Sequence, residues 1–139
     1  GGFGGERGGK PETFPALEGS TPVAKVIVPT RAEQALLYRL SGDFNPLHVD
    51  PGLATKVGFE GPILHGLCTY GFTVREAVTH LCDGDPSRLA AFSARFSSVV
   101  YPGDPLTVEF HPTATAKVFA VQVSVGDRVV LDQGWAKVR

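Results

Sequence analysis

The chain has 139 residues, of which 42% are hydrophobic and 19% are charged, and its formal net charge is -1. This composition is typical of one globular domain with a single core and excludes an intrinsically disordered chain. The near-zero charge excludes a general attraction to nucleic acid or to anionic membranes, and no apolar run reaches the ~20 residues of a membrane-spanning helix.

The first nine residues, GGFGGERGG, contain six glycines, and the whole chain contains no methionine. Such a glycine-rich stretch is typical of a flexible linker. We therefore predict a linker over residues 1–19 and a folded domain over residues 20–139. A start of this kind indicates a piece of a longer chain.

Residues 23–28 form a short β-branched run that Pro29 ends, which predicts an edge strand. A helix is predicted over residues 31–40. Thr30 is placed to cap it, and Glu33 would complete a capping box.

Residues 41–62 are rich in glycine and proline, and only a short helical turn near residues 53–56 is predicted within them. Long irregular stretches inside a compact domain are uncommon and usually functional.

The strongest helix pattern covers residues 64–82. Arg75 and Glu76 are predicted to point outward, and the sequence DGDP at residues 83–86 ends the helix. The residues predicted to face the core are Leu67, Tyr70, Gly71, Val74, Ala77, Val78 and Leu81.

Two cysteines, Cys68 and Cys82, lie fourteen residues apart in this helix, or about 21 Å at ~1.5 Å per residue. That separation is too great for a disulfide. We expect free core thiols in a reducing, cytoplasmic compartment.

Strands are predicted over residues 89–100, 105–115, 117–125 and 128–138, with turns at residues 101–104 and 126–127. One long helix followed by an antiparallel meander predicts an α+β fold in which the sheet wraps around the helix.

The irregular stretch brings a carboxylate, a carboxamide and an imidazole together in Asp43, Asn45 and His48. Pro46 prevents a regular helix here, and Gly42 adds a further break. An aspartate and a histidine this close can hold one water and share its proton transfers. The alternative is that Asp43 forms an Asx-turn and that His48 is a surface loop residue.

Asp50 and His65 extend this group to a possible two-histidine, one-carboxylate metal site. Because the spacing matches no recognisable metal motif, we expect no metal here. Asp50 is instead placed to cap a short helix that begins at Pro51.

Gly66 falls in the first turn of the long helix, where a backbone N–H is free and the helix dipole is positive. Such an N–H could stabilise a developing oxyanion. The alternative is a glycine that only packs against the sheet.

Three stretches resemble one family: YRLSGDFNPLHVD at residues 38–50, GFEGPILHGLC at 58–68 and RFSSVVYPGD at 95–104. Together they resemble the (R)-specific enoyl-CoA hydratases, the hydratase 2 or MaoC-like group, which have a hot-dog fold. The resemblance extends from about residue 22 onward, and its most specific part is the run DFNPLH.

The resemblance implies that Asp43 and His48 flank the water that adds to an enoyl double bond, that Asn45 orients it, and that the Gly66 amide is the oxyanion hole. It implies a coenzyme A thioester as substrate and no cofactor. Substrate-binding candidates are His65, Lys56, Arg95 and Tyr101. Of these, Lys56 and Arg95 are candidates for a coenzyme A phosphate.

The implied product is an (R)-3-hydroxyacyl thioester. Alternatives are dehydration of acyl-carrier-protein substrates in fatty-acid synthesis, a thioesterase on the same fold, and a non-catalytic acyl-binding module. In the family a similar GGFGG stretch joins two tandem hot-dog halves, and this chain resembles the second. The expected partner is therefore a second hot-dog unit, from the same precursor or from a homodimer.

Overall fold

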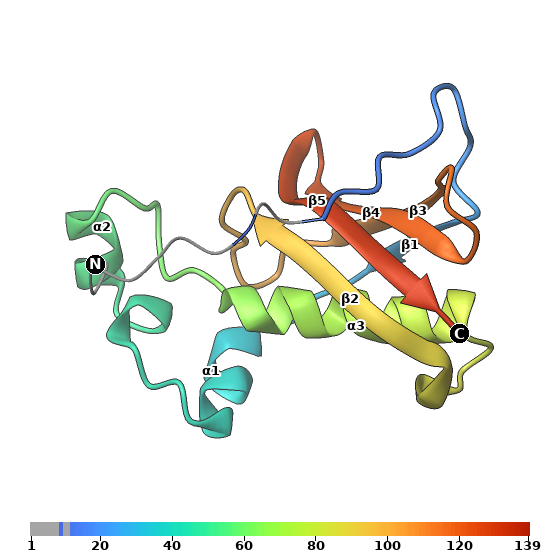
Figure 1. Ribbon diagram of the computed structural model, residues 1–139. Helices are drawn as coiled ribbons and strands as arrows, with labels where there is room; N and C mark the ends of the chain where they lie inside the picture. The colour runs from blue at the N-terminus through green and yellow to red at the C-terminus, as the bar shows by residue number, and fades with distance from the viewer. Residues whose placement is uncertain (1–8, 10–11) are drawn as a thin grey trace.

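The computed structural model describes Gly9 and residues 12–139 of the chain. In this part, five antiparallel strands form one sheet with the order β1-β3-β4-β5-β2, and the sheet curves around the long helix α3 (Gly66–Leu81) (Figure 1). The predicted α+β hot-dog arrangement is confirmed. The strands are β1 (Ala24–Val28), β2 (Leu89–Phe96), β3 (Leu106–Pro112), β4 (Val118–Val125) and β5 (Arg128–Val138).

The concave face of the sheet is apolar because alternate strand residues point to the same side. In β3, Leu106, Val108 and Phe110 are all fully buried, while the residues between them are half-buried.

β1 pairs only with β3 and is an edge strand, as predicted. The predicted strand 89–100 ends at Phe96, because Val100 leaves the sheet and its carbonyl accepts a hydrogen bond from Leu64.

The helix α3 has the predicted extent, and the predicted facing of its side chains is right only in part. Ala77 is buried and Arg75 is exposed, as predicted. Leu67, predicted to face the core, is 62% exposed, and Glu76, predicted to point outward, is buried. The side turned to the sheet carries smaller residues, Thr69, Thr73 and Ala77, which let helix and sheet approach closely. Since apolar residues occur around the whole helix, periodicity did not distinguish the two sides. The two cysteines are free and buried, as predicted.

The predicted helix over residues 31–40 is shorter: α1 covers Gln34–Tyr38 and continues as the 3-10 turn η1 (Arg39–Ser41). The predicted capping box is wrong, since α1 has no side-chain cap. Thr30 instead donates to the Asp104 carbonyl oxygen at 2.8 Å and accepts from the Gly103 N–H at 2.9 Å. Its hydroxyl therefore anchors the turn at residues 101–104.

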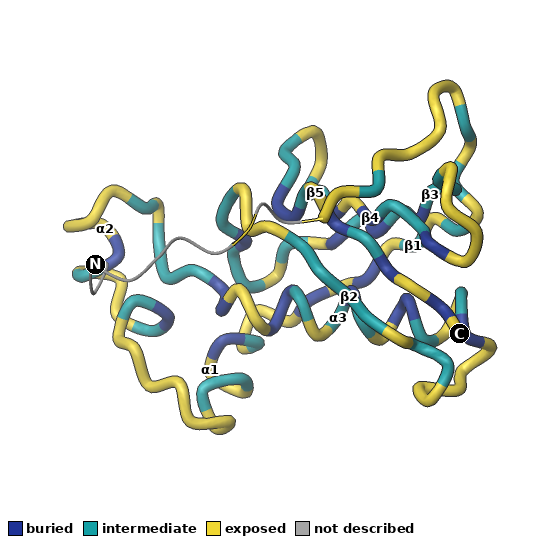
Figure 2. The backbone as a smooth tube through the Cα atoms, in the orientation of Figure 1, coloured by how far each residue is buried: buried dark blue, intermediate teal, exposed yellow. Residues whose placement is uncertain are grey.

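We call residues 39–65 the site segment. It contains η1, the 3-10 turn η2 (Pro46–His48) and the helix α2 (Pro51–Lys56). It extends beyond the N-terminal end of α3 (Figure 1) and is largely exposed (Figure 2). Asp50 caps α2 as predicted, accepting hydrogen bonds from the N–H groups of Gly52 and Leu53.

Residues 12–17, inside the range predicted as linker, contact the sheet. Ala16 forms a bridge to Thr113, and the Trp135 indole donates to the Glu12 carbonyl oxygen at 3.1 Å. Apart from Gly9, the glycine-rich start lies outside the described residues. None of the helices in the described residues combines the length and the apolar character that a membrane span requires.

Candidate active site

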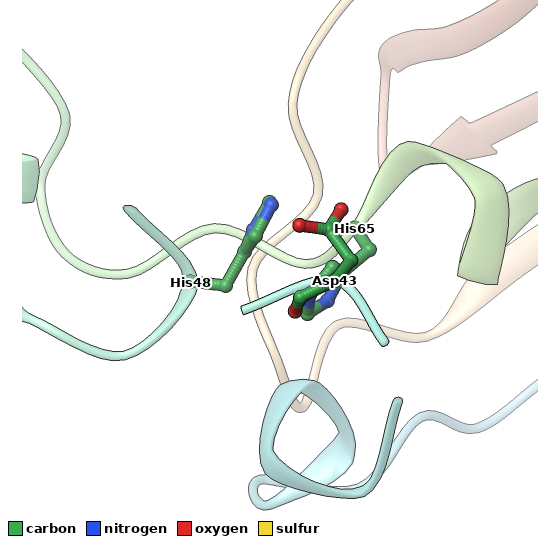
Figure 3. A group of neighbouring side chains, drawn as sticks. All are labelled: Asp43, His48 and His65. Atoms are coloured by element: carbon green, nitrogen blue, oxygen red, sulfur yellow. The ribbon is translucent and has the colours of Figure 1, made fainter. Parts of the chain in front are cut away.

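Three of the predicted site residues meet in space: Asp43, His48 and His65 (Figure 3). One ligand atom from each side chain lies within 4.8 Å of those of the other two. Asp43 follows η1, His48 ends η2, and His65 immediately precedes α3. Asp43 is exposed, whereas only 9% of His48 and 2% of His65 are accessible. The cluster therefore has a solvent side and a buried side.

Local hydrogen bonds hold Asp43 in place. Its Oδ1 accepts from the Asn45 N–H at 3.2 Å, which forms an Asx-turn. The Asn45 Oδ1 in turn accepts from the Leu47 N–H at 3.0 Å and caps η2. Gly42, with φ of 108°, supplies the left-handed residue that ends η1. Asp43 thus forms the Asx-turn of the alternative interpretation, which is compatible with a catalytic role.

The orientation of His48 determines which ring nitrogen is available for chemistry. Its Nδ1 lies 2.7 Å from the Ile63 carbonyl oxygen. Because a carbonyl only accepts hydrogen bonds, Nδ1 carries the proton, and a neutral His48 keeps its lone pair on Nε2. A lone pair on Nε2 can accept a proton from water.

No side-chain hydrogen bond joins Asp43 and His48 among the described residues, although their ligand atoms lie within 4.8 Å. A water about 2.8 Å from each group would bridge such a separation. The pair can therefore hold one water between a carboxylate and an imidazole.

His65 lies behind the pair. Its ring stacks on His48 with centroids 3.6 Å apart and an interplanar angle of 25°, and its Nε2 lies 3.2 Å from the Asp43 carbonyl oxygen. Burial lowers the pKa of His65, more than the hydrogen bond to Asp43 raises it. His65, a predicted substrate-binding residue, thus presents almost no surface to a ligand.

The same three side chains resemble a set of metal ligands, but their orientation does not suit one ion. Nearly parallel stacked rings direct their nitrogen lone pairs side by side rather than toward one point. In addition, Nδ1 of His48 and Nε2 of His65 both face backbone carbonyl oxygens. The cluster fits acid/base chemistry better than tetrahedral or octahedral coordination.

Gly66 is the first residue of α3 and is exposed. Its N–H has no acceptor one turn earlier in the helix, as for any first helical residue. A Cβ here would lie 3.1 Å from the Phe96 ring, so the packing interpretation also has support. Gly66, Thr69 and Phe96 line a cavity of about 180 Å³.

A second cavity, of about 340 Å³, lies beside His48. Tyr101 also lines it, with Ala35, Leu36 and Val49 among its apolar residues. A larger cavity of about 430 Å³ lies under residues 13–16 on the sheet, and His111 is the titratable residue in its lining. Only the smaller two adjoin the candidate catalytic groups.

The other predicted substrate-binding residues are less closely tied to the cluster. The Tyr101 hydroxyl accepts from the Glu60 N–H at 3.3 Å. Lys56 is exposed in the last turn of α2. Arg95 forms a bidentate ion pair with Asp132 at 2.7 and 2.6 Å, and this carboxylate raises the pKa of Arg95.

Two contributors were missed by sequence reasoning. The Ile63 carbonyl fixes His48, and the Tyr38 ring lies 4.7 Å from that of His65. A backbone carbonyl leaves no side-chain signal. Tyr38 carries a signal only as the first residue of the family-like stretch at residues 38–50.

Comparison with known proteins identifies the family of this chain. The MaoC like domain family matches residues 13–133. The 3-hydroxyacyl-thioester dehydratase Y of Mycobacterium tuberculosis is 46% identical in an alignment of length 140 that covers 96% of this chain and 48% of that protein. The enoyl-CoA hydratase ChsH3 of the same organism is 45% identical over 96% of this chain and 46% of its own length.

Solved structures of proteins with related names also match the fold of this chain. The full-length peroxisomal multifunctional enzyme type 2 from Drosophila melanogaster matches with a TM-score of 0.86 and 37% identity, over 98% of this chain and 25% of that one. The R-hydratase PhaJ1 from Pseudomonas aeruginosa matches with a TM-score of 0.68 and 26% identity, over 88% and 81% of the two chains. The chain spans about half the length of the curated relatives, and it belongs to the MaoC-like dehydratase domain family.

Proposed function

We propose that this chain carries the catalytic site for reversible addition of water to a trans-2-enoyl-CoA, giving the (R)-3-hydroxyacyl-CoA. The observation that carries the proposal is the separation of Asp43 and His48, which suits one bridging water. The names of relatives support the reaction class: one is an enoyl-CoA hydratase and one solved structure is an R-hydratase.

The step requires one base and one acid. A water held between Asp43 and His48 loses a proton to the pair as its oxygen bonds to C3 of the substrate. The electrons of the C2–C3 double bond then move toward the thioester, and the pair returns a proton to C2. Because the two groups would share one water, we assign both transfers to the pair rather than to single residues.

The thioester oxygen gains negative charge during this step. The exposed first N–H of α3, at Gly66, is a suitable donor for that oxygen, since the positive end of the helix dipole lies at the same place. The free side-chain amide of Asn45 is available to orient the water, because the Asn45 Oδ1 already accepts from the Leu47 N–H.

The reaction adds the elements of water without oxidation or reduction, so we propose that no metal or redox cofactor takes part. The same residues serve the reverse dehydration, and the relative named 3-hydroxyacyl-thioester dehydratase favours that direction as the second candidate. For the coenzyme A phosphates, Lys56 is the better candidate, since Asp132 already pairs with Arg95.

We also propose that a second hot-dog unit covers an apolar surface around the start of α3. The relatives are about twice as long as this chain, and a groove on α3 is lined by Tyr38, Leu67 and Phe72. Large apolar side chains are exposed on α1 and in the residues that follow it, and on the first turn of α3: Leu36, Leu37, Leu40, Phe44 and Leu67. Exposed apolar groups of this size mark contact surfaces.

Light scattering after size exclusion, with mass spectrometry of the peak, tests the assembly. The expected particle contains two hot-dog units. A stable and fully active particle of one 14.7 kDa chain would show that no second unit is needed.

The function is tested with crotonyl-CoA, by following the loss of enoyl-thioester absorbance and then identifying the product enantiomer. We expect hydration to (R)-3-hydroxybutyryl-CoA. Binding of the acyl-CoA without turnover would favour a non-catalytic module, and release of free coenzyme A would favour a thioesterase.

A further inference from the structure

We propose that His65 is a positioning residue. As a neutral imidazole protonated on Nε2, it donates a hydrogen bond to the Asp43 backbone, and its ring packs against the ring of His48. This inference rests on the proposed function for its effect on catalysis. Its structural part, the protonation state and tautomer of His65, can be tested without any activity measurement.

The hydrogen bond of His65 determines its tautomer. Nε2 lies 3.2 Å from the Asp43 carbonyl oxygen, which can only accept, so Nε2 carries the proton. The other nitrogen, Nδ1, is buried and has no partner among the described residues. A proton on Nδ1 would therefore be a buried positive charge with no hydrogen-bond acceptor, which is costly.

The groups around the ring also disfavour a charged His65. His48 stacks on it from η2, and Tyr38 packs on it from α1. Arg39, in η1, disfavours a second positive charge, while Asp43 favours one, first through the hydrogen bond to its carbonyl oxygen and then through its exposed carboxylate. Burial dominates this balance and lowers the pKa of His65.

His65 thereby couples the two catalytic groups without contacting substrate. One edge of its ring fixes the main chain of Asp43, and one face limits the tilt of His48. His48 is fixed independently by the Ile63 carbonyl oxygen. Loss of the hydrogen bond from His65 should therefore move Asp43 more than His48, and shifts of about 1 Å can cost ~10²-fold in rate.

Two substitutions separate the hydrogen bond from the stacked ring. His65→Phe keeps an aromatic face but removes the N–H donor, whereas His65→Gln supplies an amide N–H near the position of Nε2 without the ring. We expect His65→Phe to lower kcat by ~10²-fold with a much smaller change in KM, and His65→Gln to recover a large part of that loss. A folded His65→Phe protein with kcat within a few-fold of wild type would overturn the proposal, as would a His65→Gln protein no better than His65→Phe.

Long-range ¹⁵N–¹H spectra of the unmodified protein between pH 8 and 5 provide the second test. We expect His65 to stay protonated on Nε2 alone when the pH falls to ~6.5, the ordinary pKa of an imidazole. A proton on Nδ1 at neutral pH, or half-protonation of the ring at or above pH ~6.5, would overturn the proposal even if hydratase activity is found. Absence of activity with the expected spectra would instead count against the proposed function.

Discussion

The sheet with α3 and the site segment, residues 39–65, are held together by different interactions. Buried apolar side chains such as Leu106, Val108 and Phe110 join the sheet to the helix. The site segment is fixed by hydrogen bonds from side chains to the backbone, at Asn45 and Asp50 for example. Stability and chemistry should therefore respond to different substitutions.

The largest expected effect is a loss of hydration rate without a loss of stability. Asp43→Asn keeps an acceptor for the Asn45 N–H, and His48→Gln keeps an amide donor for the Ile63 carbonyl oxygen. Each should lower the hydration rate by ~10²–10⁴-fold, because a proton-transferring group is lost, with little change in the thermal midpoint. Steady-state kinetics and thermal unfolding measure both. More than about a tenth of wild-type activity in either variant would rule out its assigned role.

The opposite outcome is expected in the core. Phe110→Ala removes a fully buried ring and should cost ~3–5 kcal/mol of unfolding free energy. Urea denaturation measures this loss. The rate per folded molecule, at a temperature where the variant is folded, should stay near that of the unmodified protein. A parallel fall in both quantities would show that the two regions are not separable.

The junction of the two regions is Gly66. Gly66→Pro deletes the proposed oxyanion donor, while Gly66→Ala keeps the N–H and adds a methyl group near the same Phe96 ring. Proline is tolerated at the first helical position, so both variants should fold. We expect Gly66→Pro to lose ~10²–10³-fold in kcat relative to Gly66→Ala. Equal turnover of the two variants would exclude this amide from catalysis.

Much of the first region was predictable from the chain. The β-branched run at residues 23–28, the turns at residues 101–104 and 126–127 and the helical spacing in α3 predicted the strands, the helix and their order. The facing of α3 was only partly predictable. Ala77 is buried as predicted, but Leu67 is apolar and exposed, and a spacing pattern does not distinguish a buried apolar residue from an exposed one. Thr30 was also misassigned, because its hydroxyl bonds to Asp104, 74 residues away in sequence.

In the site segment, the residue types were informative in the sequence, whereas their arrangement in space was not predictable. The run DFNPLH indicated Asp43, Asn45 and His48 through their residue types and turn chemistry. His65, which we propose positions two of them, comes seventeen residues after His48 and stacks on it only in the folded chain. Local sequence thus indicated the proposed reacting groups, whereas their orientation depends on tertiary contacts that a short motif does not contain.

A smaller effect is expected at Asn45. Asn45→Ala removes the cap on the Leu47 N–H, a loss of about 1 kcal/mol for a typical cap, and the side-chain amide that orients water. We expect a rate about tenfold lower, since no proton transfer is lost. Asn45→Asp, which keeps the cap, is the matched control in the same kinetic assay. A loss as large as that of Asp43→Asn would mean that Asn45 does more than orient.

The smallest effect concerns stability and pH. The pKa of His65 is lowered in the folded protein. At pH 8 the ring is neutral in both the folded and the unfolded chain, so it does not affect stability there. As the pH falls below ~6.5, the unfolded chain takes up the proton first and the folded state loses stability. Urea denaturation between pH 8 and 5 should show a weaker pH dependence for His65→Phe than for the unmodified protein. Identical pH dependence would contradict the buried, neutral state of His65.

The central claim is that Asp43 and His48 act as one unit on a single water. A double-mutant cycle of Asp43→Asn and His48→Gln, measured by crotonyl-CoA hydration, tests it most directly. Groups that act as a unit have strongly non-additive effects, so the double variant should be little slower than the slower single variant. Rate losses that multiply, with all variants folded, would contradict the shared water and assign the two residues to separate steps.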